Sequence, residues 1–384
     1  MIPFNKPHLT GKEAHYMYDA VHTGKLSGNG KYTQKCQKWF EETYGFGKCL
    51  LTTSCTDALE MAAILIDIQP GDEVILPSYT FVSTANAFVL RGAKLVFADC
   101  RKDHPGIDEA SIEALITPKT KAIVPVHYAG VACDMDIIMD IANRHGLFVV
   151  EDAAQSIDSF YTGRDGVKRA LGSIGHLAAF SFHETKNIIS GEGGMLAIND
   201  MQFAKRAEII WEKGTNRSSF FRGEVDKYGW VDVGSSFLPS EVIAAFLWAQ
   251  LENIHDIQNR RRIIWNTYYK ELKQWSERHD IGLPFVPDFA SYNAHMFYLV
   301  CNNLEQRTQL IDYFKVNNIL AVFHYISLHT SPFYEGKHDG RILPETDRYT
   351  DCLVRLPMYY ELSQADIIFI TSKIHQYYAS LGKK

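Results

Sequence analysis

Residues 73–99 read EVILPSYTFVSTANAFVLRGAKLVFAD and place two short apolar runs on either side of a helical segment. The runs Glu73–Pro77 and Lys94–Asp99 have the length and composition of buried strands, and Phe81–Arg91 between them has the apolar spacing of a helix. A strand, a helix and a second strand in this order indicate a parallel pair joined by a crossover helix. This stretch therefore predicts an α/β fold.

The alternation continues on both sides of this stretch. Further helices are expected over residues 57–68, 108–116 and 136–145, and further strands over residues 122–127, 147–152, 178–182 and 195–198. Short apolar runs that alternate with helices are typical of a mostly parallel sheet with helices on both faces. We therefore expect ligands to bind outside the carboxyl ends of the strands.

The pattern changes near residue 240. A long helix is expected from Ser240 toward Trp275, and its basic segment Arg260–Arg262 indicates a face exposed to solvent. Strand-like and helical segments follow at residues 295–300, 306–317, 320–324 and 364–378. We therefore predict two domains, a large one over residues 1–245 and a smaller α+β one over residues 246–384.

The composition is that of a folded, mildly acidic protein. Of 384 residues, 46% are apolar, and 39 Lys and Arg against 45 Asp and Glu leave a formal charge of −6. These values exclude a disordered, collagen-like or coiled-coil chain. They also argue against a dedicated nucleic-acid binder, which carries a strongly basic face.

The cysteines and apolar segments indicate a cytoplasmic protein. Seven cysteines, an odd number without a CxxC pair, are expected to be free thiols in a reducing compartment. The first residues lack the apolar core of a signal peptide. Proline and polar residues interrupt the longest uncharged apolar stretch, Val74–Leu90, so no membrane span is expected.

Two groups of polar residues lie where predicted strands and helices meet. Ser54-Cys55-Thr56 precedes a helix, and hydroxyl groups beside the free N–H groups of a helix N-terminus can bind a phosphate; a plain helix cap is the alternative. Asp152 ends an apolar strand, where it needs a cationic or N–H partner, and Gln155 lies three residues on. For Asp152, a structural cap of the next element is the alternative.

The third group is Lys186 in the segment Ser181–Asn187 (SFHETKN), followed by Gly191–Gly194 (GEGG). A lysine between a buried strand and a glycine-rich return can be desolvated, which lowers its pKa and makes its amine a nucleophile for a carbonyl. A lone lysine is more often a surface residue. Together, however, the helix start, Asp152 and Lys186 are the parts that hold pyridoxal phosphate (PLP).

Five motifs in this order resemble the DegT/StrS-type sugar aminotransferases across essentially the whole chain. They are Thr53–Thr56 (TSCT), Pro77–Phe81 (PSYTF), Pro125–Gly130 (PVHYAG), Glu151–Gln155 (EDAAQ) and Ser181–Gly194. The resemblance implies a fold-type I PLP-dependent enzyme. Such an enzyme has a large domain built on a mostly parallel seven-stranded sheet and a smaller α+β domain.

The resemblance also assigns cofactor contacts, residue by residue. It implies that Lys186 forms the internal aldimine and that Asp152 pairs with the pyridinium nitrogen. Phe81 is expected to stack on one ring face, and Gln155 to contact the other face or the phenolic oxygen. The phosphate contacts are expected from Ser54, Thr56 and Ser181, with Cys55 in the same cofactor-binding segment.

The chain departs from the family at one cofactor contact. Many members place an asparagine from the partner subunit near the position of Leu238, to complete the phosphate site. Here the segment Gly234–Leu238 reads GSSFL. Either a nearby serine replaces the asparagine or the contact is missing.

Two further segments are candidates for substrate contacts. One is a loop-like basic segment with Arg217, Arg222, Lys227 and Tyr228, expected to meet the diphosphate of a nucleotide sugar across a dimer interface. A solvated basic loop is the alternative. The resemblance places the other segment, with His324, Tyr325 and His329, beside the sugar. The spacing of these histidines fits one face of neither a helix nor a strand, so substrate contacts are preferred to a metal site.

The reaction that the resemblance implies is a two-step amino transfer. An amino donor, expected to be L-glutamate, loads the cofactor, which then passes the amine to carbon 4 of dTDP-4-keto-6-deoxy-D-glucose. Residues 1–5, 65–71, 127–133 and 213–217 resemble members that form dTDP-4-amino-4,6-dideoxy-D-galactose for surface polysaccharides. A homodimer with shared active sites is expected.

Several alternatives stay open at this point. The product could carry an equatorial amine at carbon 4 or an amine at carbon 3, and a PLP-binding regulator without turnover is a remote alternative. Lys186 argues against the sugar dehydratases of the family, in which a histidine replaces the lysine. A Rossmann dehydrogenase is disfavoured because Gly28-Asn29-Gly30 lacks a third glycine and a preceding strand.

Overall fold

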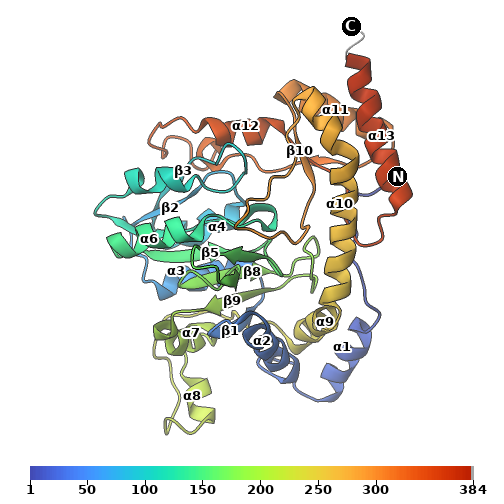
Figure 1. The fold of residues 1–384 in the computed structure, drawn as a ribbon. Helices are drawn as coiled ribbons and strands as arrows, with labels where there is room; N and C mark the ends of the chain where they lie inside the picture. Colours follow the sequence, from blue (N-terminus) through green and yellow to red (C-terminus); the bar gives the residue numbers. More distant parts are fainter. Residues whose placement is uncertain (382–384) are drawn as a thin grey trace.

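The computed structural model describes residues 1–381, and its centre is a seven-stranded sheet (Figure 1). All of its strands are parallel except β9, which runs antiparallel between β1 and β8. This confirms the predicted α/β fold with a mostly parallel sheet. In spatial order the strands are β1 (Lys48–Thr52), β9 (Gly194–Ile198), β8 (Leu177–Ser181), β5 (Phe148–Asp152), β4 (Thr120–Ile123), β2 (Glu73–Pro77) and β3 (Lys94–Ala98).

Helices cover both faces of this sheet, because successive strand residues point to opposite sides. Val74 packs in one apolar cluster, whereas its neighbour Ile75 packs in the cluster on the opposite face. The helices of the first face are α3 (Cys55–Leu65), α4 (Val82–Val89) and α7 (Ala204–Trp211). Those of the other face are α2 (Lys31–Tyr44), α5 (Glu109–Ile112), α6 (Met135–His145) and α9 (Glu241–Leu251).

The C-terminal part of the chain forms a smaller unit beside the sheet (Figure 1). Its antiparallel sheet has the order β10 (Tyr298–Val300), β12 (Leu353–Arg355), β11 (Val322–Phe323). Its helices are α10 (Ile254–His279), α11 (Leu304–Val316), α12 (Pro344–Cys352) and α13 (Gln364–Leu381). Ile2 joins the apolar core of this unit and pairs with Ile319.

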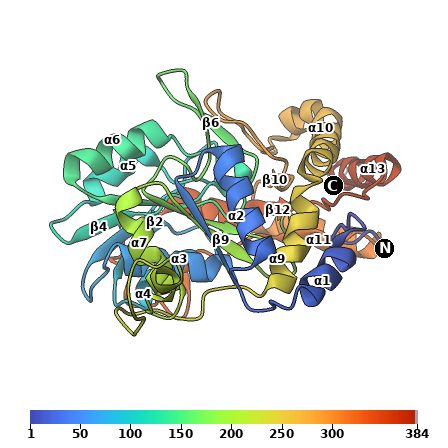
Figure 2. The ribbon, with the colours of Figure 1, turned by 90° about the horizontal axis from the view of Figure 1, so that it is seen from below.

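The predicted boundary after residue 245 falls inside α9. Figure 2 shows α9 between α1 (Glu13–His22) and α2, and it contacts both of these helices. The division into residues 1–245 and 246–384 stays a prediction. Among the helices of residues 1–381, none combines the length and apolar character that a membrane span requires.

The prediction of a single long helix from residue 240 is wrong. The structure has two helices, α9 and α10, and Figure 1 shows α9 nearly end-on where α10 lies along its length. Asn253 between them leaves the helical conformation at φ −114° and ψ 11°, and its side chain donates to the Ala249 carbonyl at 2.8 Å. An asparagine that bonds to the backbone in this way favours a helix end over a helix interior.

The prediction that Arg260–Arg262 forms a solvent-exposed face is also wrong. Arg261 is buried and donates to the carbonyls of Ala294 at 3.0 Å and His295 at 2.7 Å. Burial therefore lowers its pKa to about 9. The physical reason is that α10 packs on other parts of the chain along this stretch, so that the guanidinium replaces water with backbone carbonyls.

Candidate active site

Strand β9 brings the helix start and the Lys186 segment together. Its first residue, Gly194, pairs with Thr52 on one side and with Ser181 on the other. A Cβ atom on Gly194 would lie 2.3 Å from the carbonyl carbon of Ser54 and 2.4 Å from the amide nitrogen of Cys55. Only glycine fits here. Because Thr52 and Ser181 both pair with Gly194, they lie about 10 Å apart, two strand spacings across the sheet.

The N-terminus of α3 is open to an anion. Ser54 caps the helix by accepting a hydrogen bond from the Asp57 N–H at 3.1 Å, which leaves its own hydroxyl proton free. Within residues 1–381, the N–H groups of Cys55 and Thr56 have no acceptor, and the Thr56 hydroxyl lies 2.7 Å from that of Ser83. Free N–H groups and hydroxyls at the positive end of a helix are the donors that a phosphate needs.

Helix α2 differs from α3 in this respect. At the start of α2, the Glu241 carboxylate accepts the N–H groups of Gly30 at 2.8 Å and Tyr32 at 2.7 Å. Helix α2 therefore has at its N-terminus an anion that the chain itself supplies.

Asp152 lies at the carboxyl end of β5, beside β8. Its Oδ2 accepts the Thr84 hydroxyl at 2.6 Å, and its Oδ1 accepts the Ala154 N–H at 3.1 Å. The residue is 5% exposed and has no ion pair within the described part of the chain. A carboxylate offers about four acceptor sites, so two of them remain for a cationic N–H ligand.

Lys186 lies in the loop between β8 and β9. Over residues 1–381, its side-chain amine makes neither an ion pair nor a hydrogen bond. Burial lowers the pKa of Lys186, the nearby Cys55 and Asp152 oppose this lowering, and the charge of Arg355 adds to it. A lowered pKa increases the unprotonated fraction of the amine at a given pH, and this is the form that attacks an aldehyde.

Two hydrogen bonds fix the side chain of Gln155. Its Oε1 accepts the Ala129 N–H at 2.7 Å, and its Nε2 donates to the Tyr325 hydroxyl at 3.1 Å. The Tyr325 ring stacks on His324 with 3.5 Å between centroids and lies 6.2 Å from the ring of Phe81. Phe81 is 56% exposed at the start of α4, so its ring is available to cover a ligand.

The two histidines of the C-terminal segment have different surroundings. His324 Nδ1 lies 2.7 Å from the Tyr128 hydroxyl, and burial lowers the pKa of His324 well below its usual range. His329 Nδ1 lies 2.9 Å from the Ser78 hydroxyl, and its Nε2 lies 3.4 Å from Asp347. The structure therefore joins His324 and Tyr325 to Gln155, and it gives His329 other partners.

Sequence reasoning missed Arg355, the last residue of β12. Its Nε is buried without a hydrogen-bond partner, and no carboxylate pairs with its guanidinium among residues 1–381. Burial lowers the pKa of Arg355, and the neighbouring Tyr128, Tyr325 and Tyr79 oppose this lowering. The available signal was an arginine inside the apolar run Leu353–Leu356 (LVRL), where a charge is unusual.

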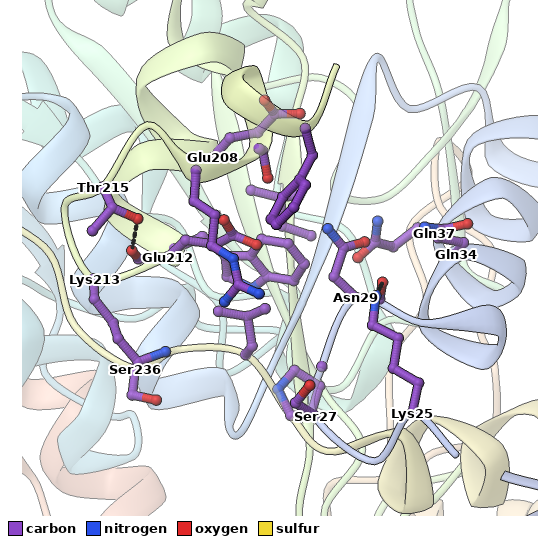
Figure 3. A pocket seen from close by; sticks show the side chains of 18 of the residues that line it. Lys25, Ser27, Asn29, Gln34, Gln37, Glu208, Glu212, Lys213, Thr215 and Ser236 are labelled. Atoms are coloured by element: carbon purple, nitrogen blue, oxygen red, sulfur yellow. Dashed lines mark hydrogen bonds between the residues drawn. The ribbon is translucent and has the colours of Figure 1, made fainter. Parts of the chain in front are cut away.

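The basic segment around residues 213–233 lines a separate cavity of about 820 Å³ (Figure 3). Lys213 and Ser236 lie on one side of this cavity and Asn29 and Lys25 on the other. Lys48, at the start of β1, also lines the cavity. Ser236 and Leu238, which also line the cavity, flank Phe237, whose carbonyl accepts the Thr53 N–H at 3.1 Å, so one wall of the cavity adjoins the start of α3.

The candidate substrate residues of this segment are not equivalent. Arg222 forms ion pairs with Glu208 at 2.8 Å and Glu224 at 2.6 Å, whereas Arg217 lies over the ring of Phe221 at 5.1 Å. Arg217, Arg222 and Tyr228 line the cavity; Lys227 is exposed and does not. The segment includes α8 (Arg217–Phe221), and Figure 1 shows α8 extending from the body of the molecule.

A sequence model of the DegT/DnrJ/EryC1/StrS aminotransferase family matches residues 7–375. The chain belongs to this family. The aminotransferase is 33% identical over 375 residues to the spore coat polysaccharide biosynthesis protein SpsC of Bacillus subtilis (strain 168), across 95% of this chain and 94% of that protein.

Solved structures of similar proteins have the same fold. The aminotransferase TlmJ of Streptoalloteichus hindustanus superposes with a TM-score of 0.90 at 26% identity, over 99% of this chain and 100% of that one. The S. venezuelae protein DesV, in complex with a ketimine intermediate, superposes with a TM-score of 0.87 at 28% identity, over 98% of both chains. The predicted enzyme class, a PLP-dependent sugar aminotransferase, is confirmed.

The residues present fit PLP. The open N-terminus of α3 offers donors for its phosphate, and Asp152 keeps acceptor sites for a protonated ring nitrogen. The unpaired amine of Lys186 is available for its aldehyde. The first two of these features are joined through the start of α4, where Ser83 lies 2.7 Å from the Thr56 hydroxyl and its neighbour Thr84 donates to Asp152 at 2.6 Å.

Proposed function

We propose that this aminotransferase moves the amino group of L-glutamate to carbon 4 of dTDP-4-keto-6-deoxy-D-glucose and forms dTDP-4-amino-4,6-dideoxy-D-galactose. The observation that carries the amino-transfer chemistry is the half-buried, unpaired amine of Lys186 close to Asp152 and Arg355. The choice of sugar is supported by the resemblance of residues 65–71, 127–133 and 213–217 to enzymes that form this product.

The setting of the reaction is part of the same proposal. The similarity to SpsC, whose name assigns it to spore coat polysaccharide biosynthesis, supports a role in making a surface polysaccharide. The seven cysteines are free in the described part of the chain, which supports a reducing, cytoplasmic location.

Four groups of the chain hold the cofactor in this proposal. When bound, PLP withdraws electrons from the α-carbon of the amino donor and so acidifies its C–H bond. Lys186 would hold the aldehyde, and its amine would then be placed to remove and return the proton of the donor's α-carbon. Asp152 accepts the N–H of the ring. Ser54, Cys55, Thr56 and Ser181 surround the phosphate, and Gln155 and Phe81 hold the ring between them.

Arg355 is proposed to bind the carboxylate of the amino donor. Its guanidinium lies close enough to Lys186 to lower the pKa of that amine, and it has no carboxylate partner of its own among residues 1–381. A planar fork of N–H donors matches a carboxylate with two parallel hydrogen bonds. An amino acid held in this way presents its amino group to the Lys186 region.

His324 and Tyr325 are proposed to contact the sugar. The Tyr325 hydroxyl already accepts from Gln155, so its own proton can be donated to a sugar oxygen. His324 is half-buried, and its lowered pKa keeps the ring neutral, which suits an uncharged hexose. His329 is bonded to Ser78 and Asp347, and we assign it to holding this segment in place.

A second copy of the chain is proposed to complete each active site. Among the described residues, the lining of the basic cavity includes none of Lys186, Asp152 and Arg355, so its cations do not face the proposed PLP site of the same chain. Trp230 is 84% exposed and Phe221 68% exposed on the extended segment, which supports burial against a partner. We propose that Arg217 binds the diphosphate of the partner's substrate and that Ser236 stands in for the missing asparagine near Leu238.

Mixing two impaired variants tests the shared site. Lys186→Ala lacks the anchor, and Arg217→Ala should raise the sugar KM, more than Arg222→Ala does because Arg222 is neutralised by two carboxylates. When the two variants are mixed in equal amounts and exchange subunits, half of the dimers are mixed, and one of the two sites in each mixed dimer is intact. A quarter of all sites are then intact, so we expect about a quarter of the wild-type rate at low sugar concentration. No recovery on mixing would show that each site takes Lys186 and Arg217 from the same chain, and it would contradict the shared site.

The product decides the sugar chemistry. The purified protein is incubated with PLP, L-glutamate and dTDP-4-keto-6-deoxy-D-glucose, and the product configuration at carbon 4 is determined by NMR. An axial amine supports the galactose-type product. An equatorial amine or a 3-amino product would replace this assignment by one of the alternatives, and absence of conversion would redirect the proposal to another keto sugar.

A further inference from the structure

Two buried threonines form a chain of hydroxyl groups behind Asp152. Thr80 Oγ1 lies 2.8 Å from Thr84 Oγ1, which lies 2.6 Å from Asp152 Oδ2. Thr84 is 1% exposed and Thr80 is 2% exposed. Thr84 belongs to the first turn of α4, so this support comes from a different element than the strand that carries Asp152.

The direction of the hydrogen bonds in this chain follows from counting protons. An ionised carboxylate only accepts hydrogen bonds, so Thr84 uses its one hydroxyl proton on Asp152. The Thr84 oxygen is then an acceptor toward Thr80, and Thr80 must donate to it. The chain of donors therefore runs from Thr80 through Thr84 to Oδ2 of the carboxylate.

The carboxylate is consequently held from two sides. Thr84 binds one oxygen, and the Ala154 N–H binds the other at 3.1 Å. Two hydrogen bonds to different oxygens fix the plane of the group and determine where its remaining acceptor sites lie. A hydrogen bond between a buried hydroxyl and a charged group is also stronger than one between neutral groups.

We propose that Thr84 is a positioning residue of the transamination site, whose hydroxyl orients the Asp152 carboxylate toward the ring nitrogen of PLP. Thr80 supports it by occupying the acceptor side of the same hydroxyl. The inference rests on the proposed role of Asp152 and adds two residues to it. The alternative is a purely structural role. In that case the two hydroxyl groups only form a hydrogen bond with each other inside the protein, and the orientation of Asp152 does not depend on them.

Cofactor affinity of the apoprotein tests this role without relying on turnover. Thr84→Val keeps the branched shape and removes the hydroxyl, and Thr84→Ser keeps the hydroxyl and removes a methyl group. We expect Thr84→Val to weaken PLP binding, measured by fluorescence titration, by about tenfold to a hundredfold, because a misoriented Asp152 carboxylate loses its hydrogen bond to the protonated ring nitrogen. Thr84→Ser should stay within about threefold of the wild type, and Thr80→Val should have a smaller effect than Thr84→Val because it removes only the indirect bond.

A double substitution separates positioning from structure. In an Asp152→Asn background, Thr84→Val should change PLP affinity by less than about twofold, since the carboxylate that it orients is gone. The pH dependence of the visible absorbance of the PLP-loaded protein should shift in Thr84→Val and not in Thr84→Ser. If Thr84→Val does not fold, Thr84→Ala and Thr84→Ser give the same comparison.

The inference is overturned by either of two results. One is wild-type PLP affinity in Thr84→Val. The other is an equal loss of affinity whether Thr84→Val is introduced into the wild type or into the Asp152→Asn variant, which would show that Thr84 acts independently of the carboxylate. Because PLP binding is measured without any sugar, a failure of the proposed sugar specificity leaves this test intact.

Discussion

Replacing Arg355 by methionine should impair one half of the reaction and spare the other. Methionine keeps the unbranched apolar stem and removes the charge. In the structure the guanidinium has a buried Nε without a partner and no carboxylate beside it within residues 1–381, so its hydrogen-bonding capacity is free for a ligand. Two hydrogen bonds to the charged carboxylate of the donor contribute about 3 kcal/mol or more, which corresponds to a loss of roughly a hundredfold in kcat/KM for L-glutamate.

The two half-reactions can be measured separately. The PLP-loaded protein is mixed with L-glutamate alone, and the conversion of the cofactor is followed by its absorbance. The protein loaded with pyridoxamine phosphate is then mixed with the keto sugar alone. In Arg355→Met, we expect the first rate to fall by roughly a hundredfold and the second to stay within about threefold. Arg278→Met is the matched control, because Arg278 is exposed near the end of α10.

Two outcomes would contradict the role of Arg355. An equal loss in both half-reactions would show that the substitution disturbs the common cofactor site and not the binding of the donor. An unchanged rate with L-glutamate would remove Arg355 from the donor site altogether.

Three further predictions concern the cofactor site and the stability of the fold. Lys186→Ala should abolish turnover in the amination assay while the protein still binds pyridoxamine phosphate, and substantial turnover would refute the assignment. Gly194→Ala should weaken PLP binding at least tenfold, because its Cβ would lie 2.3 Å from the backbone of Ser54, whereas Gly229→Ala, with no atom within 4 Å, should not. Burial lowers the pKa of His104 to about 4, so below its ordinary pKa the unfolded chain binds a proton that the folded chain does not. His104 alone should therefore lower the free energy of unfolding by about 1.6 kcal/mol between pH 6.5 and pH 5, and urea titrations of His104→Phe should show a decrease smaller than that of the wild type by about this amount.

Much of the sheet could be predicted because its signal is local. The strands β2, β3 and β5 are apolar runs bounded by turns, and the structure places them within a residue of the expected limits. β1 was not predicted, since Lys48–Thr52 is short and is preceded by no clear alternation. Its place beside β9 depends on antiparallel pairing with a strand far along the sequence.

The candidate site was predictable where residues follow strands, and not where distant segments meet. Asp152 and Lys186 each come after an apolar run, so their positions at the carboxyl ends were expected. Thr84 lies 68 residues from Asp152 and looks like an ordinary helical residue in the sequence. Arg355 lies in a strand of the smaller unit, and only the packing of that unit on the sheet brings it near Lys186.

The Glu241 carboxylate at the start of α2 affects how selectively the protein binds anions in a solution rich in phosphorylated metabolites. Glu241 is tethered to the same chain, so it competes for the N–H groups of α2 at an effective concentration on the order of millimolar or higher, and dilution does not remove it. A free phosphate ester must displace this permanent occupant at α2, whereas the N–H groups of Cys55 and Thr56 at α3 have no acceptor within residues 1–381. The two helices therefore differ in their availability to a phosphate, although each has the positive end of its dipole at its N-terminus.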